Sequence, residues 1–235
     1  MPSDGPRGLI RMMEEWDTDN IGCAGNGVRW LITADNSGTL AVSDSSELQA
    51  ASVTGTAVNN MNEIGHRLTW DAQAGYMSVE MRVDLATITN TAMNIGFNDE
   101  VAEGAATLPV ELSGTTFTSN AVTFVGFVFD TDATNDNWHV FMVDDNADTA
   151  VPIACLNTGI APVANTPQTF KVVVTDQGCG IQTRTSFWVD GLEVYNMVSS
   201  IDRDVLLTPY FASENRACGA ITTNIHYIYT EKSRP

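Results

Sequence analysis

Hydrophobic and polar residues alternate along many short segments of this chain. In residues 76–85 (YMSVEMRVDL) apolar side chains occupy every second position, and a period of two predicts a strand with one buried and one solvated face. Residues 122–129 (VTFVGFVF) are apolar almost throughout, which predicts a strand buried on both faces. Residues 138–143 (WHVFMV) follow after a polar stretch, so the two segments are expected to form a hairpin with a long polar tip.

The C-terminal part of the chain continues this pattern. Residues 185–189 and 192–195 flank Asp190-Gly191, and Asp-Gly between alternating segments indicates a tight hairpin because both turn positions need positive φ. Further strands are predicted at residues 170–175, 206–212 and 221–229. In the last segment we expect one face to carry Thr223, Ile225, Tyr227 and Tyr229.

Helical patterns are scarce, and only residues 8–16 and 45–51 are predicted to form short helices. About ten to twelve short strands with turns between them favour an all-β fold. We therefore expect residues 1–235 to form a single domain, an antiparallel two-sheet sandwich of the jelly-roll type with one or two short helices. Residues 1–20 also fit an extended N-terminal arm, and residues 101–120 an insertion or edge segment.

Charge narrows the classes of partner. The chain has 11 basic and 29 acidic residues and a formal net charge of -18, which disfavours contact with nucleic-acid phosphates and anionic lipid headgroups. Residues 1–20 lack the apolar core of a signal peptide, and no segment reaches the length needed to cross a bilayer. We expect synthesis in a cytoplasm, with no nucleic-acid partner and no membrane partner.

The four cysteines show no metal or redox spacing. They are Cys23, Cys155, Cys179 and Cys218. We expect free thiols, with a bridge between Cys179 and Cys218 as the alternative because both lie next to glycines in C-terminal turns.

Residues 129–148 are rich in Asp and Asn, which raises the question of a metal site. An EF-hand loop counted from Asp130 needs Gly at its sixth position and Glu at its twelfth. Those positions hold Asn135 and Phe141. The segment is therefore not an EF-hand.

The sequence FDTDATNDNWHVFMVD in this region resembles the metal loop of legume lectins. The resemblance implies calcium ligands at Asp130, Asn135 and Asp136 and a transition-metal ligand at His139. Val128, however, stands where that family has a bridging glutamate. We therefore predict no metal site, and interpret the segment as a polar turn whose Asp and Asn side chains bond their own backbone. Calcium binding is the alternative.

Catalytic patterns are absent. Glycoside hydrolysis needs two carboxylates flanking the sugar, and the nearest pair, Glu80 and Asp84, has Arg82 between its members. No GxSxG, P-loop or GxGxxG occurs, and no metal spacing joins the histidines, His66, His139 and His226. We assign no catalytic, cofactor-binding or metal-binding residue and expect the protein not to be an enzyme.

Aromatic side chains offer a different kind of contact, because an aromatic face packs on the C–H groups of a sugar ring. The five tryptophans are Trp16, Trp30, Trp70, Trp138 and Trp188. Most lie in alternating segments, where burial in the core is expected. Trp138 and Trp188 are the best candidates for contact with a ligand.

From Val122 onward the chain resembles the C-terminal half of the concanavalin A-like lectin/laminin-G jelly roll, especially the version found in tailed-bacteriophage virion proteins. The segments TSFWVDGLEVY, LLTPYFASENRA and NIHYIY carry most of the likeness. The resemblance implies a capsid decoration or tail-associated protein on the virion surface, which binds the major capsid protein, stabilises the shell and assembles preferentially as a trimer.

Two other functions stay open. The alternative is a lectin-like carbohydrate-binding module that holds surface glycans, and the third is a glycoside hydrolase of concanavalin-like fold. Co-purification with capsids favours decoration, whereas retention on a glycan resin favours the lectin. The hydrolase requires turnover that disappears with Glu80→Gln or Asp84→Asn.

Overall fold

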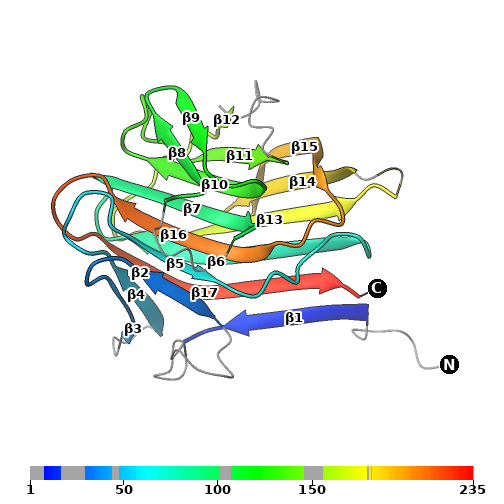
Figure 1. The fold of residues 1–235 in the computed structure, drawn as a ribbon, viewed down its shortest axis with the longest axis horizontal. Helices are drawn as coiled ribbons and strands as arrows, with labels where there is room; N and C mark the ends of the chain where they lie inside the picture. Colours follow the sequence, from blue (N-terminus) through cyan, green and yellow to red (C-terminus); the bar gives the residue numbers. More distant parts are fainter. Residues whose placement is uncertain are drawn as a thin grey trace.

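The protein is a sandwich of two antiparallel sheets stacked face to face (Figure 1). The structure is a computed structural model, and it describes residues 8–16, 30–43, 48–100, 107–145, 156–178, 180 and 182–234. The eight-stranded sheet has the order β15 (Leu192–Asp202), β14 (Gln182–Val189), β13 (Gln168–Asp176), β6 (Tyr76–Leu85), β17 (Thr222–Ser233), β4 (Gln49–Val53) and β3 (Thr39–Ser43), with β1 (Leu9–Glu14) also paired to β17. The seven-stranded sheet has the order β12 (Leu156–Asn157), β11 (His139–Val143), β10 (Phe124–Asp130), β7 (Thr91–Asn98), β16 (Thr208–Asn215), β5 (Met61–Gly65) and β2 (Leu31–Ala34). A separate hairpin consists of β8 (Val110–Ser113) and β9 (Thr116–Ser119).

The predicted all-β sandwich is confirmed, but both predicted helices are wrong. Residues 9–14 form β1, which pairs antiparallel with the C-terminal part of β17. Hydrogen bonding to that long strand outweighs the weak helical preference of a short segment. The second helix was predicted at residues 45–51, where β4 instead begins at Gln49, and residues 44–47 lie outside the described part. No helix in the described ranges is long and apolar enough to cross a membrane.

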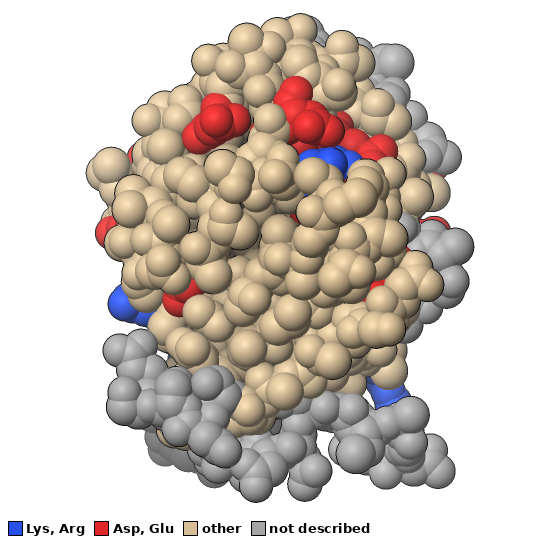
Figure 2. Space-filling view, turned by 90° about the vertical axis from the view of Figure 1, so that its left-hand side faces the viewer, with Lys and Arg blue, Asp and Glu red and all other residues tan. Residues whose placement is uncertain are grey.

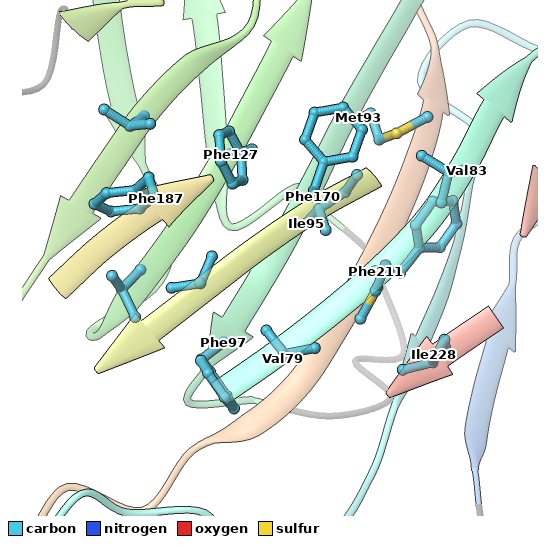
Figure 3. Packing of buried hydrophobic residues seen from close by; sticks show 14 of the residues in the cluster. Val79, Val83, Met93, Ile95, Phe97, Phe127, Phe170, Phe187, Phe211 and Ile228 are labelled. Carbon is cyan, nitrogen blue, oxygen red and sulfur yellow. The ribbon is translucent and has the colours of Figure 1, made fainter. Parts of the chain in front are cut away.

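The main core lies between the two sheets. Figure 3 shows side chains from both sheets pointing toward one another, with Phe127 of β10 facing Phe170 and Phe187 of the opposite sheet. The ring centroid of Phe127 lies 5.1 Å from that of Phe170 and 5.6 Å from that of Phe187. Edge-to-face contacts of this kind stabilise the sandwich beyond the burial of apolar area.

A second apolar cluster lies on the other face of the seven-stranded sheet, where the β8–β9 hairpin covers it. Val110 of the hairpin packs in one buried cluster with Phe124, Val128 and Phe141 of the sheet. This cover explains why every residue of β10 is buried, as the apolar sequence of this segment predicts. Part of the segment expected as an insertion, residues 107–120, thus forms a lid on the sheet, and residues 101–106 lie outside the described part.

A bulge divides β17 into two parts, and the alternation of buried and outward-pointing side chains changes between them. Its pairing with β6 shifts register between Ile225 and Tyr227. Ile225 is buried in the core, whereas Tyr227 and Tyr229 are half-buried. The prediction that Thr223, Ile225, Tyr227 and Tyr229 share one face is therefore wrong, because the extra residue at the bulge turns the two tyrosines away from the core.

Candidate functional site

The face of the eight-stranded sheet that points away from the core, here called the outer face, carries a row of large polar and aromatic side chains. The register pairs Trp188 of β14 with Lys171 of β13, Lys171 with Glu80 of β6, and Glu80 with Tyr229 of β17. Since adjacent strands lie about 4.8 Å apart, the row extends for about 14 Å across the sheet. All four side chains are half-buried, so they combine partial exposure with a fixed position.

A pocket of about 360 Å³ opens at one end of this row. Its lining consists of Glu80, Thr169, Lys171, Val173, Trp188 and Gly191. We call it the Trp188 pocket. Its volume lies in the range of small-molecule sites, and it combines an apolar aromatic wall with a few polar groups, as such sites do.

The turn between β14 and β15 shapes the rim of the pocket. Asp190 and Gly191 have φ values of 50° and 80°, which confirms the predicted Asp-Gly hairpin. A carboxylate oxygen of Asp190 accepts a hydrogen bond of 2.8 Å from the backbone N–H of Thr169, which fastens the turn to β13. Because Gly191 has no side chain and a Cβ there would meet only open space, the turn leaves the mouth of the pocket clear.

Two carboxylates on the outer face are held by tyrosine hydroxyls and cations. Tyr227 donates a hydrogen bond of 2.8 Å to Oε1 of Glu80, and Lys171 Nζ lies 3.5 Å from Oε2 of the same residue. Glu231 accepts hydrogen bonds from Tyr76 at 2.8 Å and from Tyr229 at 2.7 Å. These contacts fix the carboxylates before any ligand arrives.

The pKa shifts of Tyr227 and Glu231 agree with a neutral tyrosine and an ionised carboxylate. Burial, together with the hydrogen bond to Glu80, raises the pKa of Tyr227 to about 12. Burial alone would raise the pKa of Glu231, but hydrogen bonds from Tyr229, Tyr76 and Arg11 outweigh it and lower the pKa. A fixed, ionised carboxylate accepts hydrogen bonds strongly, for example from hydroxyl groups.

Of the two tryptophans that are the best candidates for ligand contact, the structure leaves one accessible. Trp138 is fully buried and its indole donates a hydrogen bond of 3.0 Å to Gln168, so it is a core residue, as the alternating pattern of most tryptophan segments favours. Trp188 is half-buried and lines the pocket. The remaining tryptophans are core residues: Trp16, Trp30 and Trp70.

The aspartate-rich segment does not converge on a metal. Asp130 is fully buried and binds the guanidinium of Arg216 as well as the backbone N–H of Leu112. Asn135 and Asp136 are exposed in the following turn. Within the described residues, no group of three or more His, Cys, Asp and Glu side chains could hold a metal ion.

The histidines also stay apart. His139 lies opposite Val128 in the register of β10 and β11 and packs edge-on against Phe117, with its ring centroid 5.8 Å away. Burial lowers the pKa of His139. His226 Nε2 lies 2.8 Å from Asp84, and the His66 ring packs against Trp30. Of the cysteines, Cys218 is a free, exposed thiol, and the other three lie outside the described part.

Arg216 follows β16 and joins the hairpin to the sheet. It contacts Glu111 of β8, Asp130 of β10 and Glu214 of β16. Figure 2 views the end of the sandwich that lies on the left in Figure 1, where acidic side chains gather around a basic one. Burial raises the pKa of Glu214 to about 7 although Arg216 acts in the opposite direction. This cluster of charged side chains links the β8–β9 hairpin to strands β10 and β16.

Glu80 and Asp84, the residues considered for hydrolysis, do not form a catalytic pair. Both lie on β6 and are four residues apart, which corresponds to about 13 Å along a strand. Glycosidase carboxylates are about 5 Å apart in retaining enzymes and about 6.5–9.5 Å apart in inverting ones. The carboxylate of Asp84 instead accepts a hydrogen bond from Asn224 and lies within hydrogen-bond distance of His226.

The residues that complete the pocket, Thr169 and Lys171, were not singled out from the sequence. The alternation in residues 170–175 does place Lys171 on the polar face of its strand. Nothing in the sequence, however, places that strand between β6 and β14. The pairing of distant strands creates the pocket.

The fold is that of the concanavalin and legume-lectin type of jelly roll. No protein-family model matches the chain, and no curated protein sequence does. The potassium-bound carbohydrate recognition domain of Emp46p superposes with a TM-score of 0.58 at 10% identity, over 86% of this chain and 88% of that chain. Peanut lectin with a 9mer peptide gives 0.55 at 12% identity, over 97% and 99%. Endo-β-1,4-glucuronan lyase from the fungus Trichoderma reesei gives 0.54 at 9% identity, over 92% and 95%. At such identities the similarity establishes the fold alone.

Proposed function

We propose that this protein is a lectin-like carbohydrate-binding module and that the Trp188 pocket holds the sugar. The observation that carries the proposal is the pocket of about 360 Å³ with a half-buried tryptophan beside the fixed charged pair of Lys171 and Glu80. Two of the similar structures are a carbohydrate recognition domain and a lectin. They support carbohydrate binding over a purely structural role such as capsid decoration.

The chemistry of the pocket suits a pyranose. The indole face of Trp188 offers an apolar surface for ring C–H groups. Lys171 supplies hydrogen-bond donors and Glu80 supplies acceptors. Glu80 is already held by Tyr227, so little of its side-chain entropy is lost on binding. The lining contains one cation and one anion, which favours an uncharged ligand.

The first test is the substitution Trp188→Ala. We expect at least one member of a panel of neutral oligosaccharides to bind the protein in isothermal titration calorimetry, and we expect Trp188→Ala to weaken that binding about tenfold or more because the aromatic contact is lost. The matched control is Val198→Ala on β15, which removes an exposed apolar side chain from the same sheet but not from the pocket.

Two results would count against the proposal. If no oligosaccharide of the panel binds, the protein is not a module for such sugars. If Trp188→Ala binds as tightly as Val198→Ala, the sugar lies elsewhere.

The other functions expected from the sequence are weaker proposals. The glucuronan lyase shows that this fold also carries catalysis, but Glu80 and Asp84 are too far apart on β6 to act together on one glycosidic bond. Decoration of a virion, with the major capsid protein as partner, a trimer and a virion-surface location, stays a prediction that rests on sequence resemblance alone. Co-purification with virus particles would test it.

A further inference from the structure

We propose that the Trp188 pocket selects sugars that present a free vicinal diol, a pair of hydroxyl groups on neighbouring ring carbons. This inference rests on the proposed carbohydrate-binding function and names the chemical group that is recognised. Its basis is the geometry of Lys171 and Glu80.

The two charged groups are close but incompletely engaged. Lys171 Nζ lies 3.5 Å from Glu80 Oε2, which is longer than an ordinary N–H···O hydrogen bond of about 2.9 Å. The side chains are 36% and 27% exposed, respectively. The ammonium group therefore keeps donors, and Oε2 keeps lone pairs, for a ligand.

Tyr227 fixes which oxygen of Glu80 faces the ligand. Its hydroxyl donates to Oε1 at 2.8 Å, so Oε1 is engaged by the protein and Oε2 points toward Lys171. A donor and an acceptor side by side match two neighbouring hydroxyls, because one hydroxyl donates to Oε2 while the other accepts from Nζ. A single hydroxyl can donate to Oε2 and accept from Nζ, but two neighbouring hydroxyls add at least one further hydrogen bond to the pair, which favours a vicinal diol.

The location of Trp188 sets the orientation of the ring. Trp188 is the direct cross-strand neighbour of Lys171, as Glu80 is on the other side. Directly opposed side chains lie about 5 Å apart. A pyranose packed on the indole therefore extends its ring hydroxyls toward the charged pair, which places recognition on the ring edge.

The test compares sugars that differ only in the diol. The probe is the neutral oligosaccharide that binds most tightly, used intact and after chemical removal of both hydroxyls of its vicinal diol, which leaves the pyranose ring closed. We expect the treated sugar to bind about tenfold more weakly or worse, since two hydrogen bonds to charged groups are lost. Laminarihexaose, whose internal 1,3-linked rings lack a vicinal diol, should bind more weakly than the 1,4-linked cellohexaose.

Variants assign the effect to the pair. Glu80→Gln keeps an acceptor for Tyr227 but loses the charge, and Lys171→Met keeps the apolar stem but loses the donors. Each should weaken binding of the intact sugar about tenfold and should reduce the difference between intact and treated sugar. Arg184→Met on β14 removes an exposed cation from the same sheet and serves as the control.

The outcomes separate this inference from the proposed function. Binding that depends on Trp188 but survives removal of the diol overturns the diol inference and leaves carbohydrate binding intact. Absence of binding to every sugar overturns both proposals.

Discussion

Arg216 supplies the positive charge for a group of carboxylates that includes Asp130, the first residue of the predicted calcium-ligand set. Its side chain is 7% exposed, and it lies 3.9 Å from Asp132 in addition to its contacts with Asp130, Glu111 and Glu214. A buried carboxylate without a partner would be costly, and the guanidinium supplies the missing charge. Arg216 is 86 residues away from Asp130 in the chain, so the sequence around the aspartates gives no indication of it.

At the same scale, Glu214 should make stability depend on pH. Its pKa is raised from 4.5 to about 7, with burial as the main cause. The folded protein therefore binds the Glu214 proton more tightly than the unfolded chain does. The resulting contribution to the free energy of unfolding is complete below the unfolded pKa, and it is lost as the pH rises through about 7. Glu214→Gln removes this titration. Relative to the wild type, we expect the variant to gain about 2 kcal/mol in free energy of unfolding between about pH 5 and pH 8, measured by urea denaturation.

Glu111→Gln is a second variant for this measurement. The charge of Glu111 contributes to the raised pKa of Glu214, whereas burial of Glu214 is the main cause, so Glu111→Gln should weaken the pH dependence without abolishing it. Equal pH profiles for Glu214→Gln and the wild type would show that Glu214 titrates normally.

At the scale of strands and hairpins, the sequence predicts regular elements well and irregular ones poorly. The segment 76–85 coincides with β6, and the apolar segment and the Asp-Gly turn lie where they were expected. Period two is a local property and can be read directly. The bulge in β17 and the strand β1 depend on partners far away in the chain, and no local pattern encodes them.

The pocket is unpredictable from the sequence for the same reason. The sequence offers Trp138 and Trp188 alike as candidates for ligand contact, but Trp138 is buried whereas Trp188 lines the pocket. Lys171 and Glu80 meet only because β13 lies between β6 and β14. The order of the strands in the sheet brings these side chains together, and the alternation of apolar and polar residues within each strand does not predict that order.

One buried amide strengthens the attachment of the β8–β9 hairpin to the sheet, in addition to Arg216 and the apolar cluster. Asn94 of β7 accepts a hydrogen bond of 2.8 Å from the N–H of Val110, and its amide donates at 3.0 Å to the carbonyl of the same residue. Asn94→Ala leaves both buried backbone groups without partners. We expect a loss of about 2–4 kcal/mol in free energy of unfolding and faster hydrogen exchange in residues 110–119.

Asn196→Ala is the matched control, since Asn196 bonds only side chains on the outer face, including Arg184 and Ser186. It should change stability by less than about 1 kcal/mol. Unchanged hydrogen exchange in the hairpin of Asn94→Ala would contradict the attachment described above.

At the scale of the whole molecule, the two sheets differ in the location of their basic residues. The strands of the seven-stranded sheet contain no Lys or Arg but include Glu63, Asp130 and Glu214. The strands of the eight-stranded sheet contain all the basic residues located in strands of the two sheets, namely Arg11, Arg82, Lys171, Arg184 and Lys232. The same strands also contain seven acidic residues, namely Glu14, Glu80, Asp84, Asp176, Glu193, Asp202 and Glu231. The eight-stranded sheet thus carries charges of both signs, and the pairing of Lys171 with Glu80 beside Trp188 agrees with an uncharged ligand there.

The indole N–H signals of the five tryptophans in a ¹H–¹⁵N correlation spectrum test the central claim most directly. During titration with the neutral oligosaccharide that binds most tightly, we predict that the Trp188 signal shifts together with the backbone amides of Thr169, Lys171 and Gly191, while the signals of the four buried tryptophans stay in place. Saturable shifts confined to the seven-stranded sheet, with Trp188 unchanged, would contradict the account.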